Sequence, residues 1–105
     1  MKQQFKTLLL ACAVACSVAN AQTYPDKPIT LVVPFAAGGP TDVVARMMAI
    51  PMGASLGQPV VVENVNGAGG TIGATKVARA APNGYTIFLH HMGMSTAPAL
   101  YNKLN

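Results

Sequence analysis

Cysteine is scarce in this sequence and is confined to its first residues, at Cys12 and Cys16. Both lie in a stretch typical of an export signal, with a basic start, an apolar core over 7–18 and small residues in VANAQ. We expect cleavage after Ala21, which leaves a mature chain without disulfides or thiolate chemistry. The apolar core is shorter than the roughly 20 residues of a membrane span. A lipoprotein site at Cys12 is the alternative, but its apolar core would be very short.

Charged residues are also few. Beyond the predicted signal, five basic residues face only three acidic ones, a formal net charge of +2. The basic residues are scattered along the chain and are not interleaved with aromatic side chains. A nucleic-acid groove needs a clustered basic surface, so this distribution excludes nucleic acid as a partner.

The mature sequence lacks the residue pairs from which active sites are usually built. Asp42 and Glu63 end different predicted elements, and neither mature serine lies in a G-x-S-x-G motif. His90 and His91 are predicted to point to opposite faces of a strand, whereas zinc sites usually need three or four converging ligands. We therefore expect no catalytic residues, no metal site, no cofactor and no enzymatic activity.

Three apolar, β-branched segments are predicted to form strands covered on both faces. They are residues 29–35, 59–64 and 85–91. Helical segments follow each of them, in the order β-α-β-α-β-α. This order predicts the α/β class, with a three-layer parallel sheet whose strand-end loops share one edge. Ligands bind at that edge in sheets of this kind.

The first helix is predicted to begin at Pro40 and to stop before Gly57. Val44, Met47, Met48 and Met52 fall near helical spacing and are predicted to give an apolar stripe on this helix. Pro51 is expected to kink or shorten this helix. A second helix is predicted from the glycine-rich turn to about residue 81, and a third from about residue 95 toward residue 104.

Two glycine-rich loops are the best candidates for a binding site. PFAAGGPTD (34–42) lacks the lysine and spacing of a P-loop. NGAGGTIGA (66–74) is an imperfect version of G-x-G-x-x-G, and no acidic residue follows Glu63 to hold a ribose, which argues against a dinucleotide. Anion recognition by backbone remains, because Gly38 and Gly39 permit positive φ and the next helix offers free N–H groups. A plain strand-to-helix turn is the equal alternative.

Asp42 has three possible roles in the first of these loops. An acidic residue in the first turn stabilises a helix and can cap it. It can instead accept a hydrogen bond from bound water, or pair with an ammonium group on a ligand. The residues alone do not decide among these roles.

Three segments carry a resemblance to a known family: PFAAGGPTD, VVVENVNGAGGTIG and APNGYT. Together with their order over 22–105 and the export signal, they resemble the substrate-binding proteins of tripartite tricarboxylate transporters, the Bug-type periplasmic receptors. The resemblance implies the first lobe of a type II periplasmic-binding-protein fold. It also implies a monomeric periplasmic receptor that is not an enzyme and that delivers a ligand to membrane permease subunits.

The implied ligand is a small organic carboxylate, such as a citrate-like acid, a dicarboxylate, an amino acid or an aromatic acid. The resemblance places the ligand against the two glycine loops and the segment after the third strand. The implied binding residues are Phe35, Ala36, Ala37, Gly38, Gly39, Thr41, Asp42, Asn64, Gly69, Gly70, Thr71 and Ser95.

Family members are roughly three times as long as this sequence. We therefore expect residues 22–105 to form an incomplete, N-terminal part of the first lobe, after a signal peptide over 1–21. Two other hypotheses stay open: an inert fragment of a truncated gene, and an exported α/β enzyme that binds a nucleotide through NGAGGTIG.

Overall fold

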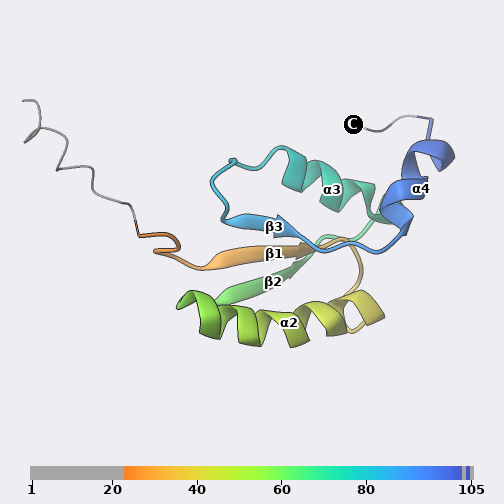
Figure 1. Ribbon diagram of the computed structural model, residues 1–105. Coiled ribbons are helices and arrows are strands. Elements are labelled where there is room, and N and C mark those ends of the chain that lie inside the picture. Colours follow the sequence, from red (N-terminus) through yellow and green to blue (C-terminus); the bar gives the residue numbers. More distant parts are fainter. Residues whose placement is uncertain (1–22, 103, 105) are drawn as a thin grey trace, which may run out of the picture.

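The computed structural model describes residues 23–102 and residue 104, so the predicted signal peptide lies outside the described residues. A sheet of three parallel strands forms the centre, made of β1 (Ile29–Val33), β2 (Val60–Asn64) and β3 (Thr86–Phe88). β1 lies in the middle, in the order β2-β1-β3, and Leu31 pairs with both Val62 and Ile87 (Figure 1). Because the strands are parallel, their amino ends all lie at one edge of the sheet and their carboxyl ends all lie at the opposite edge.

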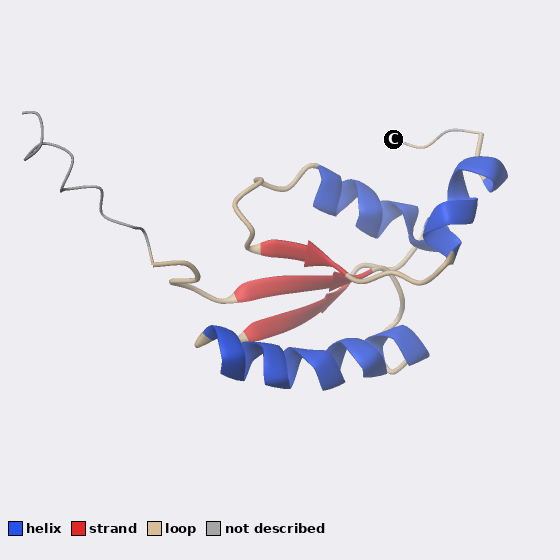
Figure 2. Cartoon of the chain, in the orientation of Figure 1, coloured by secondary structure: helices blue, strands red, loops and turns tan. Residues whose placement is uncertain are grey.

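Helices cover both faces of this sheet. α2 (Pro40–Leu56) packs against β1 and β2, and α3 (Thr71–Ala78) packs against β1 and β3 from the other side (Figure 2). A single 3-10 turn, η2 (Ala68–Gly70), precedes α3, and α4 (Gly93–Leu100) follows β3. The predicted three-layer α/β fold is confirmed.

The core lies along the middle strand. Leu31, Val32 and Val33 are almost fully buried, as expected for a strand with a helix on each face. Leu31 and Val33 form one buried cluster with Ala45 of α2. Val32 points to the opposite face because side chains alternate along a strand, and α3 covers that face.

The apolar stripe predicted on the first helix is not its buried face, although Met52 is half-buried. Met47 is 69% exposed, and Val44 and Met48 are also exposed, whereas the buried positions of α2 are Asp42, Ala45 and Ala49. The small alanines let the helix axis approach the sheet closely, so the large apolar residues lie on its outer side. Helical spacing alone did not distinguish these two faces.

Pro51 does not shorten α2, contrary to one of the two expectations for it, because the helix continues to Leu56. Pro51 lies on the exposed side, where the carbonyl that it leaves without a partner is open to water. Gly57 ends the helix as predicted, with φ 70° and its N–H donating to the Gly53 carbonyl.

The later elements are shorter than predicted. β3 ends at Phe88, although the Leu89 N–H still donates to the Val32 carbonyl. α3 ends at Ala78 because the next residues form a tighter turn, in which the Ala80 N–H donates to the Val77 carbonyl. α4 begins two residues before Ser95 and ends at Leu100, which is four residues earlier than expected.

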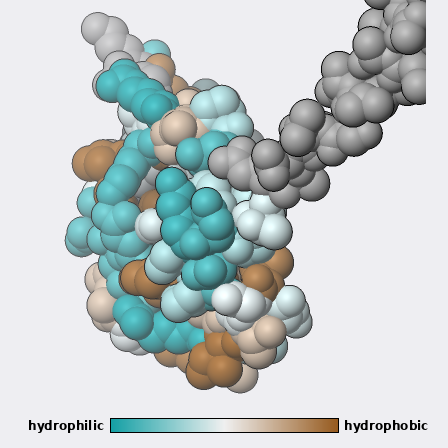
Figure 3. Space-filling model, turned by 90° about the vertical axis from the view of Figure 1, so that its left-hand side faces the viewer, coloured by the Kyte–Doolittle hydropathy of each residue, from teal (hydrophilic) through white to brown (hydrophobic). Residues whose placement is uncertain are grey.

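The amino edge of the sheet is closed by a polar contact between distant segments. The Tyr24 hydroxyl donates to the Gly84 carbonyl (2.6 Å), and the Tyr85 hydroxyl donates to the Asp26 carboxylate. The two tyrosine rings meet edge to face at 5.1 Å. Figure 3 looks at this edge, and hydrophilic side chains occupy much of its centre. No helix in the described part of the chain is long and apolar enough to cross a membrane.

Gly73 lets α3 lie close to the end of β1, and this contact gives a test of the packing. A Cβ at Gly73 would lie 2.8 Å from Pro34 Cβ and 3.0 Å from the Val65 carbonyl oxygen. We expect Gly73→Ala to lower the free energy of unfolding by about 1–3 kcal/mol through overpacking, although alanine favours helix by up to about 1 kcal/mol. Urea denaturation measures the change.

The matched control is Ser55→Ala on the exposed side of α2. It should change the free energy of unfolding by no more than about 0.5 kcal/mol. A higher denaturation midpoint for Gly73→Ala would contradict the close packing of α3 on β1.

Candidate functional site

The predicted binding residues gather at the carboxyl edge of the sheet. β1, β2 and β3 all end at this edge, where α2, α3 and α4 begin (Figure 1). The parallel arrangement therefore brings together three loops that lie far apart in the sequence: residues 34–39, 65–70 and 89–92.

The loop after β1 is a tight turn that leads directly into α2. The Gly39 N–H donates to the Ala36 carbonyl (3.2 Å), and Gly38 has φ 82°. The sequence suggested that Gly39 could also have positive φ, but its φ is −74°. A Cβ on Gly39 would lie 3.2 Å from the Ala36 carbonyl oxygen. Gly38 is thus needed for its backbone conformation and Gly39 for space.

Asp42 anchors this loop from the first turn of α2. Its side chain is 2% exposed, and its oxygens accept hydrogen bonds from the Gly38 N–H (2.8 Å) and from Arg46 Nε (2.9 Å). Asn64, at the end of β2, donates from Nδ2 to Asp42 Oδ1 (2.9 Å) and to the Phe35 carbonyl (3.0 Å). One carboxylate therefore ties the loop to its own helix and to the neighbouring strand.

This network stabilises the ionised form of Asp42. The hydrogen bond from Arg46, then those from Gly38 and Asn64, hold the pKa of this carboxyl well below its usual value of 3.8. The same contact raises the pKa of Arg46. The buried carboxylate is fully paired, so it leaves no unsatisfied charge in the loop.

The network bears on the three roles considered for Asp42. No side chain caps α2 at Gly39, and Asp42 instead reaches back to the N–H of the residue before that cap position. Both of its oxygens bind groups of the protein. Asp42 therefore holds the loop in position, and its contact with a ligand or bound water stays a prediction.

The same loop exposes backbone donors. Ala36, Ala37 and Gly38 are exposed, and within the described residues the amides of Ala36, Ala37, Thr41 and Asp42 form no hydrogen bond with another backbone group or side chain. The last two belong to the first turn of α2, whose aligned peptide dipoles favour a nearby anion. Donors arranged around a helix start can hold a carboxylate or a similar anion.

The loop after β2 is built on four successive residues with positive φ, from Gly67 to Gly70. Ala68 is the only one with a side chain, at φ 44°. Gly70 is buried, and a Cβ there would lie 2.6 Å from His90 Nε2. A Cβ on Gly69 would lie 2.2 Å from the Tyr101 hydroxyl oxygen. Both predicted residues, Gly69 and Gly70, therefore also serve packing against the segments that follow β3.

The hydroxyl groups of the predicted site differ in their availability. Thr71, the first residue of α3, donates to the Ala68 carbonyl (2.9 Å), and Ser95 in α4 donates to the Met92 carbonyl (2.7 Å). Thr41 forms no side-chain hydrogen bond within the described residues. Thr41 is therefore the predicted hydroxyl that is free to contact a ligand.

His90 and His91 were predicted to point to opposite faces of a strand, and this is wrong. β3 ends at Phe88, so the backbone has left the sheet before His90, and the two rings meet at 4.8 Å. His91 stacks on Phe35 at 4.6 Å with an angle of 16°, and His90 contacts the same ring edge to face at 5.2 Å. Sequence reasoning missed this aromatic cluster because it depends on where β3 ends.

Arg46 was also missed as part of the site. Its Nη2 donates to Asn64 Oδ1 (3.2 Å), while the side chain stays 55% exposed. The spacing of Asp42 and Arg46, four residues apart on a helix, was a signal that could have identified the pair. In residues 23–102 and 104, no three His, Cys, Asp or Glu side chains form a group able to hold a metal.

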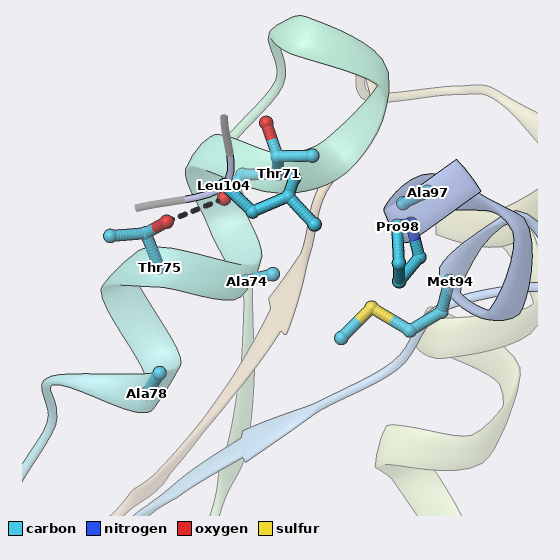
Figure 4. Close-up of a pocket in the computed structure, with 8 residues that line it drawn as sticks. All are labelled: Thr71, Ala74, Thr75, Ala78, Met94, Ala97, Pro98 and Leu104. Carbon is cyan, nitrogen blue, oxygen red and sulfur yellow. Dashed lines mark hydrogen bonds between the residues drawn. The ribbon is translucent and has the colours of Figure 1, made fainter. Parts of the chain in front are cut away.

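An apolar pocket of about 220 Å³ borders this edge between α3 and α4. In Figure 4, Ala74, Met94 and Pro98 face it from the two helices, and Thr71 lies at its margin. It offers no charged group and few polar ones, so it is not suited to hold a carboxylate.

Comparison with known proteins identifies the family. The family model described as "Tripartite tricarboxylate transporter family receptor" matches residues 44–105. A UPF0065 protein in the TAR-I ttuE-ttuC' intergenic region of Agrobacterium vitis is 50% identical over 105 residues, covering 99% of this chain and 30% of that protein. The chain belongs to the tripartite tricarboxylate transporter family receptors.

Solved receptors of this family share the fold described above. The periplasmic binding protein BugD is 64% identical with a TM-score of 0.74, over 75% of this chain and 26% of BugD. MatC from Rhodopseudomonas palustris, solved with bound malate, is 52% identical with a TM-score of 0.74, over 77% of this chain and 28% of MatC. The predicted Bug-type resemblance is confirmed, and these relatives are binding proteins rather than enzymes.

The chain spans about 30% of the length of the curated relatives that it matches. Within the described residues, the three loops at the carboxyl edge of the sheet form the candidate site. A cleft that buries most of a small ligand needs walls on more than one side.

The low pKa of Asp42 predicts how acid affects a receptor with this loop. Because the folded-state pKa lies below the usual 3.8, the carboxylate contributes stability that is present above about pH 4 and is lost as the pH falls further. We expect Asp42→Asn to lower the melting temperature at pH 7 by about 5 °C and to remove part of this acid-sensitive loss. Thermal melts followed by circular dichroism from about pH 7 to pH 2.5 measure both.

The control is Asp26→Asn, which changes an exposed carboxylate at the opposite edge of the sheet. This variant should keep the acid-sensitive loss of the wild type. An Asp42→Asn protein with the wild-type acid profile would show that the network around Asp42 does not contribute to stability.

Proposed function

We propose that the protein carrying this sequence is a periplasmic receptor that binds a small organic carboxylate and delivers it to the permease subunits of a tripartite tricarboxylate transporter. The observation that carries this proposal is the set of free amides in 36–42, on a loop that Asp42, Asn64 and Arg46 hold in place. The family membership and the malate bound to the related MatC support it.

The proposed binding mode places one ligand carboxylate against the loop after β1. The amides of Ala36 and Ala37 and the first turn of α2 supply N–H donors, and the Thr41 hydroxyl supplies one more. The negative charge of Asp42 does not oppose this, since Arg46 lies within hydrogen-bond distance and compensates it. Asn64, Gly69, Gly70, Thr71 and Ser95 line the same edge in this proposal.

We further propose that residues 1–21 are a signal peptide and that residues 22–105 form the N-terminal part of the first lobe. The basic start, apolar core and small residues of 1–21 support the first part, and the share of the relatives that the chain covers supports the second. In this proposal the receptor acts as a monomer. Its ligand lies between this lobe and a second one, since a ligand buried on all sides needs walls from both lobes.

Thermal stabilisation by ligands tests the receptor function. We expect malate or succinate to raise the melting temperature of the full protein, because a ligand that binds only the folded state adds about 2.7 kcal/mol at a hundred times its Kd. ATP and NAD serve as controls. Stabilisation by a nucleotide without any by carboxylates would favour the nucleotide-binding hypothesis. A random-coil circular dichroism spectrum of the 105-residue product would favour an inert fragment.

Thr41→Val tests the proposed binding mode. The substitution keeps the shape of the side chain and removes the free hydroxyl. We expect affinity for the stabilising carboxylate to fall about tenfold, because a hydrogen bond to a charged group contributes about 1.5–3 kcal/mol. The melting temperature without ligand should stay unchanged, since Thr41 bonds to no other described residue. Isothermal titration calorimetry measures the affinity.

Ser55→Ala, at the far end of the same helix, is the matched control and should bind as the wild type does. Unchanged affinity in Thr41→Val would remove the hydroxyl from the proposed binding mode.

A further inference from the structure

His91 occupies a position between the loop after β1 and the start of α4. Its ring stacks on Phe35, in the proposed carboxylate loop. His90 lies beside it, with Nε2 against Gly70 of the second glycine loop. The two histidines therefore bridge the loops that follow all three strands.

A hydrogen bond selects the tautomer of the neutral His91 ring. Its Nδ1 accepts the N–H of Gly93 (2.9 Å), so in the neutral ring the proton is carried by Nε2. The His91 carbonyl accepts a hydrogen bond from His90 Nδ1 (2.7 Å). Within the described residues Nε2 of His91 has no partner, and the residue is exposed. It is a donor with a fixed direction and no acceptor.

Four other cationic or donor side chains near this edge are already engaged. Arg46 donates to Asp42 and Asn64, and Lys76 of α3 donates to Glu63. Thr71 and Ser95 donate to backbone carbonyls. Thr41, in the first turn of α2, and His91, on the loop after β3, in contrast present side-chain donors without a partner among the described residues.

We propose that His91 sets the ligand preference of this site by donating a hydrogen bond from Nε2 to a second carboxylate of the ligand. The inference rests on the proposed function, in which the first carboxylate binds the loop after β1. The substrate class is then a short dicarboxylate rather than a monocarboxylate. Phe35 and Gly93 hold the His91 ring, so little side-chain freedom is lost when the ligand binds.

Two substitutions separate the donor from the stacking. His91→Phe keeps an aromatic ring for Phe35 and removes the donor, whereas His91→Gln removes the ring and keeps an N–H donor near the position of Nε2. Affinities of the full protein are measured by calorimetry for two matched pairs of probes: succinate with butyrate, and malate with 2-hydroxybutyrate. In each pair a carboxylate is replaced by a methyl group.

We expect His91→Phe to weaken succinate and malate binding about tenfold and to leave butyrate and 2-hydroxybutyrate unchanged. His91→Gln should keep most of the wild-type preference for the dicarboxylates. Melting temperatures without ligand verify that both variants are folded, which their exposed position favours.

Two results would overturn this inference and leave the proposed function standing. In the first, His91→Phe keeps the wild-type ratio of dicarboxylate to monocarboxylate affinity. In the second, His91→Phe loses the same affinity for both members of a pair. Wild-type protein that binds none of the four probes but binds another carboxylate would also overturn this inference alone, whereas wild-type protein that binds no carboxylate would overturn the proposed function and this inference with it.

Discussion

The carboxylate of Asp42 is the interaction on which the rest of the site depends. A buried charge is costly unless it is paired and hydrogen-bonded, and Asp42 meets both conditions with partners from three parts of the chain. Gly38 lies in the loop, Arg46 one turn along α2, and Asn64 on the neighbouring strand. The loop after β1 is therefore held in place by the contacts of this carboxylate.

The exposed residues of this loop have small side chains or none, so backbone groups are accessible there. Within the described residues the amides of Ala36 and Ala37 have no hydrogen-bond partner, and the residues that carry them are small and exposed. An anion can approach such a surface closely because no bulky side chain covers it. The charge of Asp42 is compensated by Arg46, so it supports the loop without repelling an anionic ligand.

The glycines at this edge serve two physical purposes. Gly38 adopts a positive φ that turns the chain from β1 into α2, and nothing lies near its missing Cβ. Gly73 has an ordinary helical position, but Pro34 and the Val65 carbonyl leave no room for a Cβ. One glycine therefore shapes a loop, and the other brings α3 against the sheet so that the loops after β1 and β2 lie together.

Much of this protein was determined by the sequence itself. The alternation of β-branched runs with helical segments predicted the parallel three-layer fold, and the glycine motifs identified both loops, because these signals are local. The buried face of α2, the end of β3 and the partners of Asp42 were decided only by the tertiary structure. They depend on how closely a helix approaches the sheet and on contacts between residues such as Asp42 and Asn64, 22 positions apart. The stacking of His91 on Phe35 belongs to the same class, since it exists only once the sheet has brought the ends of β1 and β3 together.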